Sequence, residues 1–267
     1  MSTIELQIIF KSLIASFWLG ITLSLLGIFV FIRKMTFFSD GIAHATIFSL
    51  ALAFLLNFNI FFTSLIFVIL LALIIFILEN KTKIHTDTII GIIFVTFLSL
   101  GLILMSRKAS YQPELLNFLL GNILLVNNFD FILTIILNSL ILILIIINFE
   151  KIMFSLIDPN EARLRKLNPK NYQLLFYFLL AISVILGIKI SGIILVSAFL
   201  ILPAATSSLI STSLRRFIFL TLLIALINIS LGFLISFKYF FPLGASITLI
   251  GSILFFAAFI LKLALKF

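Results

Sequence analysis

The sequence contains no cysteine, and only 10% of its 267 residues are charged. Without cysteine the chain forms no disulfide and offers no thiolate, so any metal ligands must be oxygen or nitrogen atoms. The charged fraction lies far below the roughly 25% of soluble domains. Because 63% of the residues are hydrophobic and the mean hydropathy is +1.39, the composition excludes a soluble globular protein. It indicates an all-α, polytopic membrane protein in contact with lipid.

Two further absences bear on function. No Gly-x-x-x-x-Gly-Lys-Ser/Thr motif occurs, so the chain has no nucleotide-binding loop of that kind and is not expected to hydrolyse ATP itself. The chain also has only nine carboxylates, most of them at the ends of predicted spans. A membrane-embedded enzyme would be expected to cluster its acids and bases, so transport is favoured over catalysis.

Spans can be counted by length, because a crossing helix needs about 20 apolar residues. The first run is read as a retained span, since no small-residue cleavage site follows it. The apolar runs are 12–32, 41–78 (two helices, divided at Asn57-Phe58-Asn59), 88–106, 131–149, 171–188, 190–214, 217–237 and 239–261. They predict nine spans, or eight if the first is peripheral. The run at 114–130 is too short to cross and is expected to be interfacial or re-entrant.

The basic residues give an orientation. With a cytoplasmic carboxyl terminus, most of the 18 Lys and Arg residues lie on the cytoplasmic side, and nine spans then place the amino terminus outside. The net charge of +9 therefore reflects membrane topology and does not indicate nucleic acid. The largest cytoplasmic segment is 150–171, where Asp158-Pro159 and Glu161 predict the start of a short helix that Pro169 would stop. Such a helix either contacts a soluble motor subunit or is simply solvated, and charge alone does not decide.

Two ionisable residues lie inside an apolar run. Asp40 and His44 are four residues apart and so face the same side of a helix, where their side chains can meet a polar solute such as a divalent metal. Two alternatives remain open: Asp40 could cap a helix that begins near Gly41, and His44 could be a satisfied polar residue of the bundle. Asp87, just before another span, is read first as a cap and second as part of a wider metal path.

Three blocks of sequence carry a family resemblance. The first is SDGIAHA at 39–45, the second runs from Asp87 to Leu102 and continues at 115–126, and the third is KISGIILVSAFLILPAATSSLI at 189–210. These blocks resemble the integral-membrane subunits of ABC importers for zinc, manganese and iron, and most of all the high-affinity zinc permeases. The resemblance covers most of the chain from about residue 33 onward.

The resemblance implies a single permease domain over 1–267, in the inner membrane of a bacterium. It implies a homodimer that takes metal from an extracytoplasmic metal-binding protein and is driven by a cytoplasmic ATP-binding subunit, with Zn²⁺, or else Mn²⁺ or Fe²⁺, as cargo and no permanent cofactor. Asp40 and His44 would form the transit site. The remaining positions that it singles out are Glu161, Ala162 and Leu167 for ATPase coupling, and Gly192 and Pro203 for the pathway.

Some residues depart from the family pattern or allow another interpretation. Ser39 and Lys166 stand where the family usually has glycine, so the backbone at Ser39 and the turn after the short helix could both be altered. Pro203 is expected to kink or break its helix and to free carbonyls that must be satisfied within the protein or by a water-lined cavity. A self-sufficient carrier or channel, in which Asp40, His44 and Asp87 relay a cation, is the alternative function.

Overall fold

The structure, a computed structural model, describes residues 3–106, 128–239 and 241–265. These residues form helices and contain no strand. The helices are α1 (Thr3–Ile32), α2 (Phe38–Leu56), α3 (Ile60–Lys81), α4 (Thr86–Ser106), α6 (Asn128–Ile157), α7 (Pro159–Leu164), α8 (Pro169–Ser191), α9 (Ile193–Ile210), α10 (Leu214–Tyr239) and α11 (Leu243–Leu265). Among them, nine are long and apolar enough to cross a membrane, which confirms the nine-span prediction. The run at 114–130 lies almost wholly outside the described residues.

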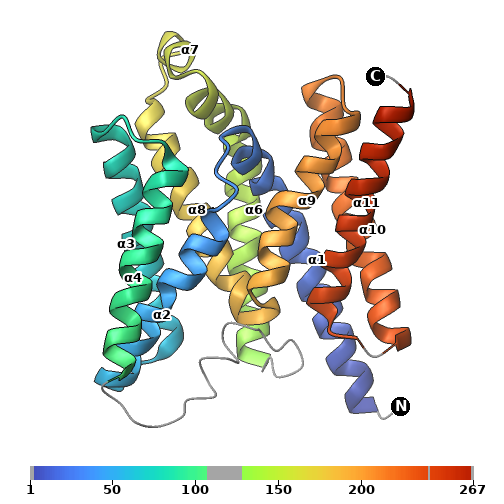
Figure 1. Ribbon diagram of the computed structural model, residues 1–267, viewed down its shortest axis with the longest axis horizontal. Helices are drawn as coiled ribbons and strands as arrows, with labels where there is room; N and C mark the ends of the chain where they lie inside the picture. Colours follow the sequence, from blue (N-terminus) through green and yellow to red (C-terminus); the bar gives the residue numbers. More distant parts are fainter. Residues whose placement is uncertain (1–2, 107–127, 240, 266–267) are drawn as a thin grey trace.

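The spans form one bundle in which successive long helices alternate in direction (Figure 1). The two ends of the chain lie at opposite ends of this bundle, as an odd number of spans requires. The short helix α7 projects at the end where the carboxyl terminus lies. Helix α1 packs against α6, α8, α9 and α10, whereas α2 packs mainly against α4. The arrangement makes α1 the common packing partner of the helices on both sides of it.

The break between the second and third spans occurs where the asparagines predict it. Asn57 ends α2 in the left-handed conformation, with φ of 55° and ψ of 36°. Asn59 caps α3, because its side-chain oxygen accepts hydrogen bonds from the backbone N–H groups of Phe61 and Phe62 at 3.0 and 3.3 Å. The local chemistry of two asparagines therefore turns the chain back into the bundle.

Pro203 does not break its helix. Helix α9 continues past it to Ile210, so of the two outcomes that the sequence allowed, a kink or a break, the break does not occur. Proline has no N–H for the carbonyl four residues earlier, here that of Phe199. The hydroxyl of Ser24 on α1 donates to this carbonyl oxygen at 3.3 Å, which satisfies the freed group within the protein. Close beside it, Gly27 lets the backbone of α1 approach the backbone of α9 at Leu200.

Gly192 joins α8 to α9 in a conformation that only glycine adopts without strain. Its φ is 80° and its ψ is 169°, and its N–H closes α8 by bonding to the carbonyl of Ile188 at 3.0 Å. The direction in which α9 leaves α8 therefore depends on this residue.

The segment after α6 forms the short helix that the sequence predicts, but it ends differently. Asp158 caps α7, and the chain then turns at Lys166, whose φ is 60°. The N–H of Leu167 bonds to the carbonyl of Ala162 at 2.9 Å, so the tight turn forms despite the missing glycine. Pro169 does not stop α7, because it is the first residue of α8. At the other departure from the family, Ser39 lies in ordinary helical backbone inside α2.

The approach of α1 to α9 gives a first prediction. A Cβ at Gly27 would lie 2.4 Å from the carbonyl oxygen of Leu200, and neither backbone can yield without separating the helices. We expect Gly27→Ala to lower the stability of the purified protein by about 1–3 kcal/mol, measured as its thermal unfolding in detergent. Gly91→Ala is the matched control: a Cβ there would meet nothing within 4 Å, so the variant should be as stable as the parent or more so. Equal stability of the two variants would contradict the close approach.

Candidate metal site and coupling segment

Helix α2 carries both candidate metal ligands on one face. It begins at Phe38, with Phe37 as its N-cap, so Asp40 lies inside the first turn. The hypothesis that Asp40 caps a helix beginning near Gly41 is therefore wrong. His44 follows one turn later, and both side chains are only partly buried, so a solute can reach them.

The Asp40 carboxylate is held by another helix. The hydroxyl of Ser197 on α9 donates to its Oδ1 at 2.6 Å, a length typical of a hydrogen bond from a hydroxyl to a charged carboxylate. The hydroxyl of Ser39 donates in turn to the oxygen of Ser197 at 3.0 Å. Among the described residues, Oδ2 of Asp40 has no hydrogen-bond partner. One carboxylate oxygen is therefore fixed while the other is available to a ligand.

His44 is oriented in a comparable way. Its Nδ1 lies 2.9 Å from the backbone carbonyl oxygen of Asp40, and a carbonyl can only accept, so we assign the proton to Nδ1. The edge-on contact with the ring of Phe94, at 5.4 Å between centroids, helps to fix the imidazole plane. This tautomer leaves the lone pair on Nε2. A bond from one ring nitrogen to a carbonyl is the usual support for a histidine that binds metal through the other.

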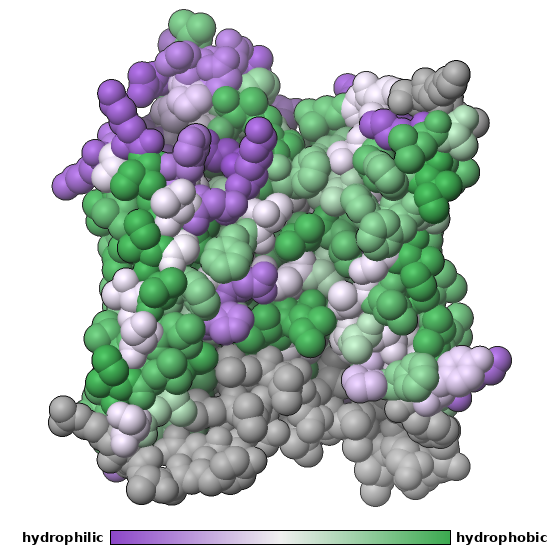
Figure 2. All heavy atoms as spheres, viewed as in Figure 1, coloured by the Kyte–Doolittle hydropathy of each residue, from purple (hydrophilic) through white to green (hydrophobic). Residues whose placement is uncertain are grey.

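These two side chains do not form a complete site within one chain. No group of three His, Asp or Glu residues that could hold a metal occurs in the described part of the chain. In particular, the structure does not gather Asp87 into one group with Asp40 and His44. Figure 2 shows most hydrophilic residues of this face at the end that carries α7, with a smaller group near its middle. The candidate site in one chain therefore consists of one oxygen donor, from Asp40, and one nitrogen donor, from His44.

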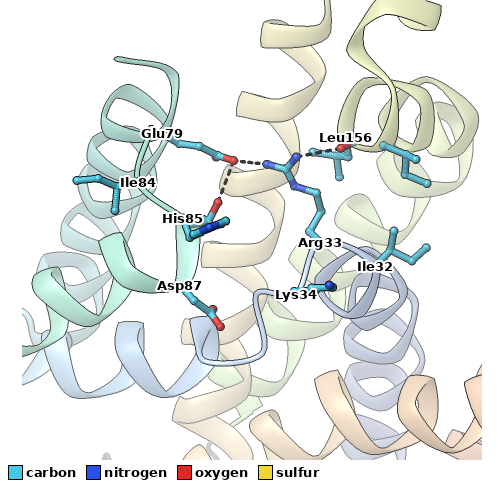
Figure 3. A pocket seen from close by; sticks show the side chains of 10 residues that line it. Ile32, Arg33, Lys34, Glu79, Ile84, His85, Asp87 and Leu156 are labelled. Atoms are coloured by element: carbon cyan, nitrogen blue, oxygen red, sulfur yellow. Dashed lines mark hydrogen bonds and ion pairs between the residues drawn. The ribbon is translucent and has the colours of Figure 1, made fainter. Parts of the chain in front are cut away.

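Asp87 lines a different feature, a cavity of about 610 Å³ (Figure 3). The cavity lies where α1 and α3 end and α4 begins. Asp87 lies in the first turn of α4 and does not act as its cap, and its carboxylate lies near the backbone N–H of Phe37, just before α2. Asp87 therefore lies where α4 packs against the helix that carries the candidate ligands. The other histidine, His85, also lines the cavity and is exposed.

Glu79, which also lines this cavity, is the centre of a group of polar contacts that the sequence analysis missed. Glu79 pairs with Arg33 and accepts a hydrogen bond from Tyr177. It also accepts from Thr86 at 2.9 Å and from Gln173 at 2.8 Å. The guanidinium of Arg33 further donates to the carbonyl of Leu156, in the last turn of α6, at 2.9 Å. One signal was present in the sequence: Glu79 and Arg33 are charges at span ends that the predicted topology places on the same side.

The residues of the candidate coupling segment differ in how accessible they are to a partner. Ala162 is fully buried, so it packs within its own chain and is not available to a partner, and Leu167 is half-buried. Glu161 is half-exposed and forms an ion pair with Arg165 at 2.9 Å. Leu164, which the sequence analysis did not single out, is 80% exposed at the end of α7. An apolar side chain that protrudes from a charged helix is the feature of this segment best suited to a protein contact.

Comparisons with known proteins support this reading of the fold. The sequence matches the ABC 3 transport family over residues 5–262. The manganese transport system membrane protein MntC of Listeria innocua is 34% identical over 250 residues, which cover 94% of this chain and 89% of that protein. The high-affinity zinc uptake system membrane protein ZnuB of Buchnera aphidicola subsp. Baizongia pistaciae is 32% identical over 231 residues, or 86% of this chain and 88% of that one.

A solved structure agrees with these relatives. PsaBC from Streptococcus pneumoniae in complex with Fab aligns with a TM-score of 0.77 and 33% identity, over 93% of this chain and 90% of that one. Since relatives are named for manganese as well as for zinc, the expected closeness to zinc permeases is supported only in part. The expected likeness to ABC importer permeases is confirmed: this multi-pass membrane protein belongs to the ABC 3 transport family.

Proposed function

We propose that this chain is the membrane subunit of an ABC importer that moves a divalent metal ion into the cytoplasm. The observation that carries the proposal is that Asp40 and His44, on one face of α2, are already oriented by hydrogen bonds. Asp40 offers Oδ2 and His44 offers Nε2, and each side chain is oriented by a hydrogen bond at its other polar atom, Oδ1 or Nδ1. The names of the relatives point to the same cargo class. Because the chain carries no Walker-type nucleotide-binding loop, a separate cytoplasmic subunit would hydrolyse ATP.

A homodimer would complete the site. Two copies of the pair supply two oxygen and two nitrogen donors, which is the number that a tetrahedral zinc site needs, at about 2.0–2.2 Å from the ion. Such a site contains no thiolate and is open to exchange, so it suits transit better than storage. An extracytoplasmic metal-binding protein would deliver the ion to the dimer.

We propose zinc as the first candidate cargo, with Mn²⁺ and Fe²⁺ as the alternatives. A mixed imidazole and carboxylate set accepts all three ions, and the general affinity order places Zn²⁺ above Mn²⁺ and Fe²⁺. The carboxylates also suit manganese, in keeping with the relatives named for that metal.

The second prediction tests the metal pair. His44→Gln keeps polarity and much of the volume but removes the imidazole nitrogen, so we expect metal affinity to fall by more than about 100-fold and uptake to be lost. The measurement is uptake of Zn²⁺ and Mn²⁺ by proteoliposomes that contain the permease, its ATPase and its binding protein. The chain has only two histidines, and the exposed His85 provides the control, since His85→Gln should transport normally.

The result also separates the two classes of function. Uptake by the His44→Gln variant equal to that of the parent would show that α2 does not carry the metal. Uptake by the parent that proceeds without ATPase and nucleotide would support a self-sufficient carrier and overturn the ABC mechanism.

The third prediction concerns coupling. We expect Leu164→Asp to uncouple the ATPase, because a charge buried in a subunit contact costs several kcal/mol unless it is paired. The purified permease should fold normally, since this side chain is 80% exposed in the free chain. Loss of co-purification with the ATPase, and of metal-stimulated ATP hydrolysis, is the measurement.

Two controls bracket this result. Leu164→Met keeps an apolar side chain and should retain coupling. Ala162→Asp introduces a charge at a fully buried position, so it should destabilise the permease itself. Full ATPase coupling in the Leu164→Asp variant would show that Leu164 of α7 does not contact the ATPase.

A further inference from the structure

Among the described residues, the hydroxyl of Ser197 is the side-chain group that forms a hydrogen bond with the carboxylate of the candidate metal pair. It comes from α9, 157 residues further along the chain than Asp40, and it donates to Oδ1 at 2.6 Å. We propose that Ser197 is a specificity-determining positioning residue: it keeps Asp40 as a ligand with a single free oxygen and thereby favours a four-coordinate ion such as Zn²⁺. This inference rests on the proposed function, because it assumes that Asp40 binds the metal.

The hydrogen bond occupies one lone pair of Oδ1 and draws charge from it, so Oδ1 is a weaker metal ligand than Oδ2. A free carboxylate can bind a metal through both oxygens, which suits ions with six or more ligands. With Oδ1 held by Ser197, only Oδ2 remains without a partner among the described residues. A single oxygen from Asp40 and a single nitrogen from His44 per chain match a tetrahedral ion, whereas Mn²⁺ favours six oxygen-rich ligands.

The hydrogen bond from Ser39 determines that Ser197 acts as the donor to Asp40. The Ser39 hydroxyl is buried, with 1% of the residue exposed, and it donates to the oxygen of Ser197 at 3.0 Å. A hydroxyl has only one hydrogen, so Ser197 accepts from Ser39 and donates its own proton to Asp40. Hydrogen bonds in such a chain strengthen one another, and this one ends on the charged ligand.

The part of α9 that carries Ser197 is held in place by contacts with α1. Two residues after Ser197, the carbonyl of Phe199 is bound by Ser24 on α1, and Leu200 lies against Gly27. The backbone that carries Ser197 is thus anchored to α1, the helix with packing partners on both sides. Asp40 is therefore oriented by a group that does not belong to its own helix.

The fourth prediction follows from this geometry. Ser197→Ala frees the second oxygen, so we expect the affinity for Zn²⁺ to fall about 10–100-fold, as is usual when the support of a metal ligand is removed. The affinity for Mn²⁺ should change less than about threefold, because a carboxylate with two free oxygens suits an ion that takes more oxygen ligands. The measurement is equilibrium binding of Zn²⁺ and of Mn²⁺ to the purified permease–ATPase complex.

Three further variants make the test specific. Ser197→Thr retains the hydroxyl and should restore the parental ratio of the two affinities. Ser208→Ala, on the same helix, removes a hydroxyl that bonds at 2.7 Å only to the carbonyl of Ala205, and should leave both affinities unchanged. Ser39→Ala removes the outer bond alone and should lower Zn²⁺ affinity about two- to tenfold. If Ser197→Ala does not assemble with the ATPase, Ser39→Ala carries the test.

The outcomes separate this inference from the proposed function. Equal weakening of both metals in Ser197→Ala would show a purely structural role and overturn the inference. Parental affinities in the Ser197→Ala variant, with binding abolished by His44→Gln, would overturn it too and leave the function intact. Parental affinities in His44→Gln would overturn the function and the inference together.

Discussion

The Glu79 carboxylate holds one end of this bundle together. A carboxylate inside a helix bundle is costly unless its charge and lone pairs are matched. Glu79 meets this condition with Arg33 directly after α1, Thr86 on α4, and Gln173 and Tyr177 on α8. Arg33 extends the set to the last turn of α6. A single charge on α3 thus connects it directly to α4 and α8 and, through Arg33, to the end of α1 and to α6.

From Glu79 a contiguous set of contacts reaches the candidate metal pair. Thr86 begins α4, and the next residue, Asp87, lies near the backbone N–H of Phe37, just before α2 starts. One turn further on, Gly41 allows α2 to pack closely against Ile90 of α4. The first turn of α2, which carries Asp40, is therefore set by α4 on one side and by Ser197 of α9 on the other. A displacement of the helix ends beside α7 would act on the carboxylate through these packed contacts.

The sequence predicted those features that depend on local pattern. Nine spans follow from length and hydropathy, the turn after α2 follows from Asn57 and Asn59, and the shared face of Asp40 and His44 follows from helical spacing. The other features depend on partners distant in sequence. Pro203 does not break α9, and the carbonyl that it frees is satisfied by Ser24, on another helix. The burial of Ala162 and the bond from Ser197 to Asp40 likewise arise only when helices pack, so no local pattern could reveal them.

The geometry of the metal pair bears on how a permease releases its cargo. On the proposed function, Asp40 and His44 are already oriented, so little rearrangement is needed to bind a metal, yet the pair provides only two donors. On the proposed function, the remaining ligands come from the second copy, and affinity then depends on the distance between the two α2 helices. A movement that separates these helices would reduce the ligand set from four to two without disturbing either pair internally. Binding and release would thus be controlled by the spacing of two rigid half-sites, which is a quantity that an ATPase acting on the far end of the bundle can change.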